Sequence, residues 1–134
     1  MYKKILLIDD DADEQFFFIE ALKEINASAK FFFANSAKEG LSLVKFLLPD
    51  FVFIDINMPA INGLECLDLI AHNEDILQPS IIIYSTTIDN SIRNNAIKKG
   101  ATACLKKQNS IHELAKLLKN ILVTNHDHSE EIIR

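Results

Sequence analysis

Acidic residues stand directly after two short apolar runs, at the positions where buried strands would end. Asp9–Asp11 follow the run 5–8, and Asp55 follows the run 51–54. Apolar runs of this length are typical of strands that are buried on both faces in a parallel sheet. The carboxyl ends of parallel strands lie at one edge of the sheet, where open α/β sheets bind ligands. These carboxylates are therefore expected to converge.

Hydroxyl and amino groups follow two further apolar segments in the same way. Ser85, Thr86 and Thr87 come at the end of one segment, and Lys106 and Lys107 come at the end of the next. A lysine at this edge would pair with a carboxylate as long as the site holds no phosphoryl group. Once a carboxylate carries a phosphoryl group, the lysine would pair with one of the phosphoryl oxygens. A hydroxyl would hydrogen-bond another phosphoryl oxygen.

This set of groups suits phosphoryl transfer. Carboxylates packed together repel, and a divalent cation relieves the repulsion. Oxygen ligands favour Mg²⁺, which takes one or two carboxylates together with a phosphate. Transfer then needs mainly positioning and neutralisation of the phosphoryl oxygens, and a carboxylate can be the covalent acceptor. We therefore expect Asp55 to be a nucleophile for phosphoryl groups.

The elements that would position these groups alternate regularly along the chain. Strands are expected at 5–8, 30–34, 50–55, 80–85 and 101–106. Helices are expected at 11–25, 36–48, 62–72, 89–99 and 110–122. Alternating strands and helices predict an α/β fold, a five-stranded parallel sheet that is doubly wound as (βα)5. The second helix is expected to turn Leu47 and Leu48 inward and to end at Pro49.

The first helix carries two features that bear on the site. Asp11 is expected to be its N-cap, with Glu14 completing a capping box. Phe16 and Ile19 lie off the helix's apolar face, so they are expected to be exposed near the acidic edge.

Length and charge restrict the alternatives. The chain has 134 residues and a net charge of −5, which argues against general nucleic-acid binding. One domain is expected over residues 1–124, followed by a polar tail at 125–134. The first apolar run is too short for a signal peptide or a membrane span. Cys66 and Cys104 lack metal-type spacing and fit reduced thiols in the cytoplasm.

Four motifs in this order resemble the receiver domain of bacterial two-component response regulators, across residues 3–123. The matching elements are Ile8-Asp9-Asp10-Asp11, Ile54-Asp55-Ile56-Asn57-Met58-Pro59 with Asn62-Gly63, Ser85, and Gly100-Ala101-Thr102 leading to Lys107. The resemblance implies a flavodoxin-like fold. It also implies that Asp55 accepts a phosphoryl group from a sensor histidine kinase or a histidine phosphotransfer protein.

The resemblance further assigns the metal ligands. Asp10 would bind Mg²⁺ directly and Asp9 largely through water. Asp55 and the backbone carbonyl of Asn57 would complete the protein ligands.

The remaining roles come from the resemblance in the same way. Ser85 would be the switch hydroxyl, and Lys107, rather than Lys106, would be the cation of the site. The lifetime of the phosphoryl group would depend on Asn57 and Thr87. The chain would be a signalling phosphoacceptor that catalyses only its own phosphorylation and dephosphorylation.

The resemblance also bears on how the signal would leave. We expect a stand-alone receiver that signals to an unidentified downstream protein through its fourth helix, fifth strand and fifth helix. No nucleic acid or membrane partner is expected.

Two positions depart from the family pattern. Gln108 stands where the family usually has a proline after a cis bond. A non-proline cis bond costs roughly 3–4 kcal/mol, so a trans Lys107–Gln108 bond is predicted, with the question of whether Lys107 is displaced. Cys104 stands where the family often has an aromatic residue that swings with the switch hydroxyl. A small thiol cannot report by that rotation.

Two other classes of protein stay open at this point. A phosphatase of the haloacid dehalogenase type would want a second acid two residues after its nucleophile, and here that residue is Asn57. A pseudo-receiver that binds partners without phosphorylation normally loses an acid or the lysine, which this chain keeps. A separate hypothesis is that Phe16 and Ile19 help dock the helix of the phosphodonor.

Overall fold

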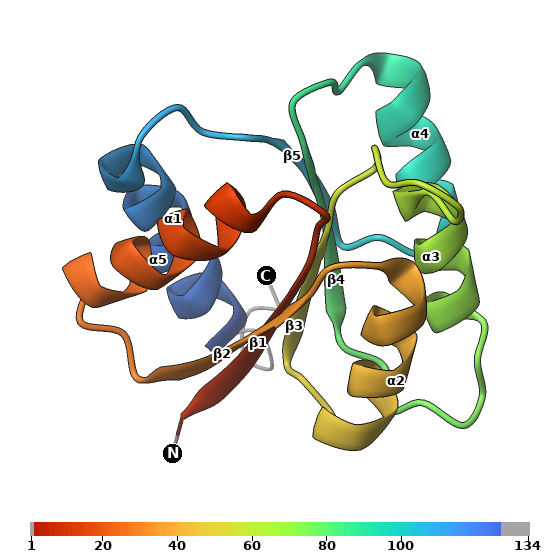
Figure 1. Cartoon of the computed structure of the whole chain (residues 1–134), viewed down its shortest axis with the longest axis horizontal. Coiled ribbons are helices and arrows are strands. Elements are labelled where there is room, and N and C mark those ends of the chain that lie inside the picture. The colour runs from red at the N-terminus through yellow and green to blue at the C-terminus, as the bar shows by residue number, and fades with distance from the viewer. Residues whose placement is uncertain (1, 127–134) are drawn as a thin grey trace.

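The computed structural model describes residues 2–126, in which five strands alternate with five helices (Figure 1). The strands are β1 (Lys3–Ile8), β2 (Ala29–Ala34), β3 (Phe51–Ile54), β4 (Ser80–Ser85) and β5 (Ala103–Lys106). The helices are α1 (Ala12–Glu24), α2 (Ala37–Leu47), α3 (Gly63–Ala71), α4 (Asn90–Lys99) and α5 (Ile111–His126). The predicted alternation is confirmed.

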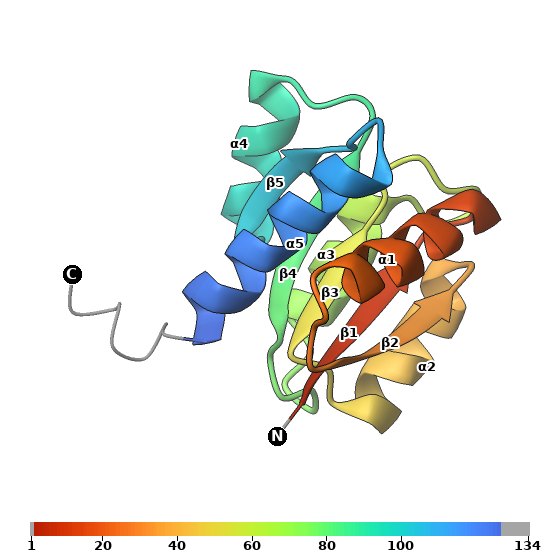
Figure 2. The same ribbon diagram turned by 90° about the vertical axis from the view of Figure 1, so that its left-hand side faces the viewer.

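All strand pairs in the sheet are parallel, and the strand order is β2-β1-β3-β4-β5. Helices α1 and α5 cover one face, and α2, α3 and α4 cover the other (Figures 1 and 2). The doubly wound (βα)5 arrangement is therefore confirmed. β1 and β3 lie inside the sheet and are covered on both faces, which is why their sequences are continuously apolar.

Alternate residues of each strand point to opposite faces of the sheet and pack in two separate hydrophobic cores. Ile5 and Leu7 of β1 pack with Phe18 on the side of α1 and α5. Leu6 and Ile8 pack into the opposite core, on the side of α2, α3 and α4. All five residues are fully buried. β1, the strand that Asp9 follows, is thus packed on both faces.

The helix ends agree with the sequence in part. Asn62 and Glu65 form the expected capping box at α3, with bonds of 3.0 and 3.3 Å. At α1 the predicted N-cap, Asp11, is confirmed, but the predicted capping box with Glu14 is wrong. Asp11 caps the helix by accepting the N–H of Asp13, while Glu14 is buried beside the sheet.

The end of α2 also differs from the prediction. The helix ends at Leu47, and Leu48 is a left-handed C-cap with φ of 53°. This conformation turns Leu48 outward, so that it is 51 % exposed and Leu47 only half-buried. Both leucines were expected to point into the core.

The C-terminal helix α5 continues to His126, past the predicted end of the domain at residue 124. The rest of the predicted polar tail, residues 127–134, lies outside the described residues. Within residues 2–126, Cys66 and Cys104 are free and buried. No helix in this part of the chain is both long and apolar enough to cross a bilayer.

Candidate functional site

The strand register brings Asp9 and Asp55 side by side. Ile8 of β1 pairs with Ile54 of β3, so the residue that follows each strand occupies the same level at the sheet edge. The N–H of Asp55 donates to the carbonyl of Ile8 over 3.0 Å. The convergence predicted from the two apolar runs is present in the structure.

Three carboxylates meet at this edge. One oxygen from each of Asp9, Asp10 and Asp55 lies within 4.8 Å of the others. Asp9 and Asp55 are buried and Asp10 is exposed, so the group opens to solvent on one side. Oδ1 of Asp55 is buried without a hydrogen bond. A set of hard oxygen donors with an unsatisfied member fits a divalent cation such as Mg²⁺.

Lys107 supplies the cation of the site. It follows β5, and its Nζ lies 2.8 Å from Oδ2 of Asp9 and 3.8 Å from Oδ1 of Asp55. Its side chain is 9 % exposed, whereas Lys106 is exposed on the strand. Lys107 is therefore not displaced.

Glu14 is a fourth acid at the site. Oε2 of Glu14 lies 3.9 Å from Nζ of Lys107, and Oε1 is buried without a hydrogen bond. Sequence reasoning missed this residue because the pattern of Asp11 and Glu14 matches a capping box. A second signal was present, because Glu14 lies in the first turn of α1, the turn that follows Asp9 and Asp10 directly.

Burial shifts the pKa of each acid in the same direction. Loss of water around Asp9, Glu14 and Asp55 raises their pKa values above the ordinary ones, and Lys107 offsets part of this rise. For Asp55 the charge of Asp9 adds to the rise. Burial alone would lower the pKa of Lys107, but its pairing with Asp9 and the nearby carboxylates raise it. The site carries more negative than positive charge, which favours a bound cation.

Ser85 is the hydroxyl that reaches the acids. It ends β4 and is fully buried, whereas Thr86 and Thr87 are exposed. Its hydrogen bond to Asp55 lowers the pKa of that carboxyl. Nδ2 of Asn57 lies 3.5 Å from Oγ of Ser85, which places the exposed Asn57 over the same edge.

Gly63 allows α3 to begin directly behind Asp55. A Cβ atom at this position would lie 2.2 Å from the carbonyl oxygen of Asp55 and 2.6 Å from Cα of Ile56. The N–H of Gly63 donates to the carbonyl of Ile56 over 2.9 Å. Any side chain here would push on the backbone that carries the acid.

The loop after Lys107 differs from the family pattern in the predicted way. No cis peptide bond is present among the described residues, so the Lys107–Gln108 bond is trans. The N–H of Gln108 donates to Oη of Tyr84 over 2.9 Å. Tyr84 immediately precedes Ser85 on β4 and is 1 % exposed.

Cys104 lies in β5 at the position where the family often has an aromatic residue. It is buried, and its carbonyl accepts a hydrogen bond of 2.6 Å from Arg93 of α4. Burial raises the pKa of the thiol. This hydrogen bond links the side chain of an α4 arginine to the backbone of β5.

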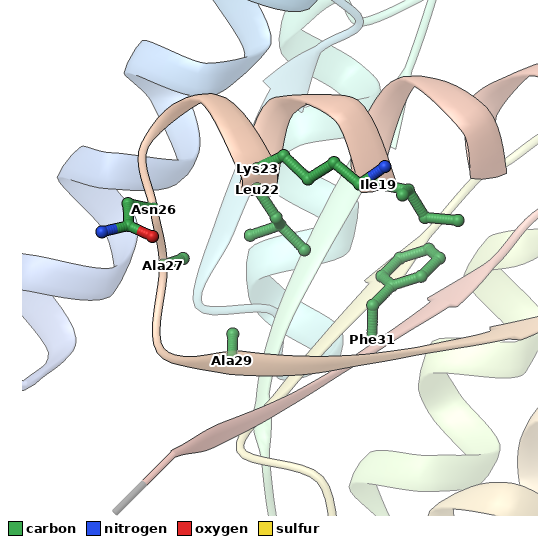
Figure 3. A pocket seen from close by; sticks show the side chains of 7 residues that line it. All are labelled: Ile19, Leu22, Lys23, Asn26, Ala27, Ala29 and Phe31. Carbon is green, nitrogen blue, oxygen red and sulfur yellow. The ribbon is translucent and has the colours of Figure 1, made fainter.

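Phe16 and Ile19 behave differently from each other. Phe16 is 56 % exposed, as expected. Ile19 is half-buried, and its side chain lies beside Phe31 of β2 in a pocket along the sheet edge (Figure 3). The lining residues are Ile19, Leu22, Lys23, Asn26, Ala27, Ala29 and Phe31. The expectation that Ile19 is exposed was wrong.

Comparison with known proteins gives a family match. A model of the family described as the response regulator receiver domain matches residues 5–119. The nitrate/nitrite response regulator protein NarL of Escherichia coli K12 is 34 % identical over 85 residues. That alignment covers 63 % of this chain and 38 % of NarL. The chain thus spans well under half the length of this relative.

Solved structures share the fold. The phosphorylated cyanobacterial phytochrome response regulator RcpA matches with a TM-score of 0.80 at 19 % identity, covering 92 % of this chain and 94 % of RcpA. The Mn²⁺-bound form of response regulator Rcp1 matches with a TM-score of 0.75 at 19 % identity, covering 89 % of this chain and 91 % of Rcp1. At these identities the likeness is one of fold.

Proposed function

The chain belongs to the response regulator receiver domain family and is a phosphoacceptor of two-component signal transduction, and we propose that Asp55 is the acceptor. In this proposal Asp55 takes the phosphoryl group of a phosphohistidine while Mg²⁺ is bound beside it. The chain catalyses only its own phosphorylation and dephosphorylation.

One observation carries the assignment of Asp55. Its carboxylate is buried at the sheet edge, lies among the carboxylates of Asp9 and Asp10, and has Nζ of Lys107 at 3.8 Å. A buried acid with an unsatisfied oxygen and a nearby cation is well placed to attack an electrophilic phosphorus.

The step conserves the phosphoryl group. An Asp55 oxygen forms a bond to phosphorus as the bond between phosphorus and the donor's imidazole nitrogen breaks, and the electron pair of that bond stays on the imidazole. Ser85 then donates a hydrogen bond to one phosphoryl oxygen, and Lys107 pairs with another. Both groups lie at the same edge as Asp55 in the structure.

Mg²⁺ would be held by Asp9, Asp10 and Asp55, together with the backbone carbonyl of Asn57. When bound, it neutralises charge on the phosphoryl oxygens. The donor chemistry of the three carboxylates supports this assignment, and the fold neighbour Rcp1 has been solved with Mn²⁺ bound.

Labelling with acetyl phosphate tests the acceptor. The protein with Mg²⁺ and acetyl phosphate should gain one phosphoryl group by intact mass, and Asp55→Asn should gain none. Asp50→Asn is the matched control, because Asp50 precedes β3 and Asp55 follows it. The control should be labelled like the wild type. Labelling that persists in Asp55→Asn would contradict the assignment, and no labelling of the wild type would favour a pseudo-receiver.

The phosphodonor is proposed to be a histidine kinase or a histidine phosphotransfer protein, with Phe16 in its docking surface. Phe16 is exposed on α1, two residues after Glu14 of the site. Phe16→Ala should slow transfer from the phosphorylated protein donor and leave labelling by acetyl phosphate unchanged. An equal loss in both assays would reject the docking role.

The output of the domain is proposed to leave through α4, β5 and α5 toward a downstream protein. The Arg93–Cys104 hydrogen bond joins two of these elements. A cytoplasmic location is proposed because it fits this signalling role and two free, buried cysteines.

A further inference from the structure

The backbone on both sides of the Lys107 side chain is fixed to β4. The N–H of Lys107 donates to the carbonyl of Ser85 over 2.9 Å. One residue later, the N–H of Gln108 donates to the phenol oxygen of Tyr84 over 2.9 Å. Two consecutive residues of β4 therefore hold two consecutive residues of the loop that carries the lysine.

The phenol that accepts the second bond is itself immobile. The Tyr84 ring packs edge-on against Phe18 and Phe53, with centroids 5.6 and 6.1 Å away. The side chain is 1 % exposed. Burial, with a smaller contribution from nearby carboxylates, raises its pKa to about 12, so the phenol stays neutral at physiological pH. A neutral hydroxyl held in a packed core is a fixed acceptor.

The bond also depends on the residue type at position 108. A proline there has no N–H and could not donate to Tyr84. Gln108 keeps the donor, and its own side chain bonds the carbonyl of Lys106 over 2.9 Å. The departure from the family pattern at this position thus comes with a hydrogen bond that a proline could not make.

We infer that Tyr84 is a positioning residue for Lys107, because its phenol oxygen fixes the Gln108 N–H and with it the loop that directs Nζ into the acidic site. The inference rests on the proposed phosphoacceptor function, since Lys107 is placed there for the phosphoryl oxygens. Without this bond, the backbone after Lys107 is held by fewer contacts. The lysine then spends less time in the geometry that transfer needs.

Two measurements on Tyr84→Phe test the inference. The variant keeps the ring against Phe18 and Phe53 and removes only the oxygen. Labelling by acetyl phosphate at saturating Mg²⁺ should slow about threefold to tenfold, the range that one hydrogen bond supports. The Mg²⁺ concentration for half the maximal rate should not rise, because Tyr84→Phe leaves every carboxylate of the site in place and changes no charge. General loosening of the site would raise that concentration as the rate falls.

Amide hydrogen exchange at Gln108, measured by NMR without phosphodonor, is the second readout. Exchange should be about tenfold faster in Tyr84→Phe. The matched control is Gln108→Ala, which keeps the N–H and should show the slow exchange of the wild type. Unchanged exchange in Tyr84→Phe would overturn the inference, as would an unchanged labelling rate or a rise in the Mg²⁺ requirement. If the wild type takes no phosphoryl group, the proposed function fails, and the exchange data alone decide whether Tyr84 fixes the loop.

Discussion

Nζ of Lys107 lies 2.8 Å from Oδ2 of Asp9 but 3.8 Å from Oδ1 of Asp55. The cation of the site is thus paired with an expected metal ligand rather than with the expected acceptor. Mg²⁺ bound by Asp9 would compete for that pairing and leave Lys107 available to a phosphoryl oxygen. We therefore expect the effects of Mg²⁺ and Lys107 to be coupled. Binding of the metal to Asp9 would come first and would free the Lys107 amino group for the phosphoryl oxygen.

Removing the amino group of Lys107 should slow phosphorylation. Lys107→Ala loses the cation that pairs with a phosphoryl oxygen, so labelling by acetyl phosphate should fall about tenfold or more. Lys106→Ala is the control, because Lys106 is the adjacent lysine and is exposed. The comparison uses labelling rates by intact mass at saturating Mg²⁺. Equal rates in the two variants would remove Lys107 from the mechanism.

Replacing Asp55 should stabilise the Mg²⁺-free protein at neutral pH. The pKa of Asp55 is raised in the folded state, so above its ordinary value of 3.8 the folded protein binds more protons than the unfolded protein. The unfolding free energy therefore falls as pH rises through the raised pKa. Asp55→Asn should be more stable at pH 7 by on the order of 1 kcal/mol.

Urea unfolding between pH 4 and pH 8 checks this prediction. The difference between Asp55→Asn and the wild type should shrink as the pH falls toward 3.8, because the folded carboxyl, whose pKa is raised, is then protonated and the unfolded one is half protonated. Excess Mg²⁺ should stabilise the wild type more than the variant. A difference that does not change with pH would show that the carboxylate charge is not its cause.

Glu14 should strengthen cation binding through its charge. Its carboxylate is buried and lies 3.9 Å from Nζ of Lys107. Glu14→Gln keeps the shape and removes one negative charge, so the Mg²⁺ Kd from calorimetry should rise about threefold to tenfold. Asp13→Asn removes an exposed charge from the same helical turn, where solvent screens it, and should change the Kd less. Equal changes in the Kd of the two variants would mean that Mg²⁺ binding depends on the net charge of the protein and not on the position of Glu14.

Gly63→Ala should damage both the fold and the site. Its Cβ would press on the backbone of Asp55 and Ile56, which cannot move without shifting the acid. We expect a loss of about 2–3 kcal/mol in unfolding free energy and slower labelling. In Gly40→Ala the atoms nearest to the new Cβ belong to the side chain of Ile8 rather than to the backbone that carries Asp55. Its labelling rate should fall less, and the reverse order would contradict this reading.

The sequence was sufficient to predict where the main acids lie. Asp9 and Asp55 end apolar runs, and a parallel sheet puts such positions at one edge. The place of Glu14 could not be predicted in the same way. A glutamate three residues after a capping aspartate has the same pattern whether its side chain turns to the backbone or to the site. Only the packing of α1 on the sheet decides between these directions.

The positions of Leu48 and Ile19 could not be predicted from the sequence either. Helical periodicity gives the face on which a residue lies but not where the helix ends, so the left-handed turn at Leu48 was not foreseen. Ile19 is half-buried and lines a pocket together with Phe31 of β2. Periodicity cannot predict which residue of β2 approaches α1.

The strand order has a consequence for synthesis of the chain. Asp9 and Lys107 lie near opposite ends of the sequence, and they meet only because β1 and β5 belong to one sheet. During translation the acids leave the ribosome well before the lysine. Until β5 joins the sheet, the nascent domain carries its carboxylates without their internal counter-ion. Mg²⁺ from solution is then expected to reduce the repulsion among these carboxylates until β5 has joined the sheet.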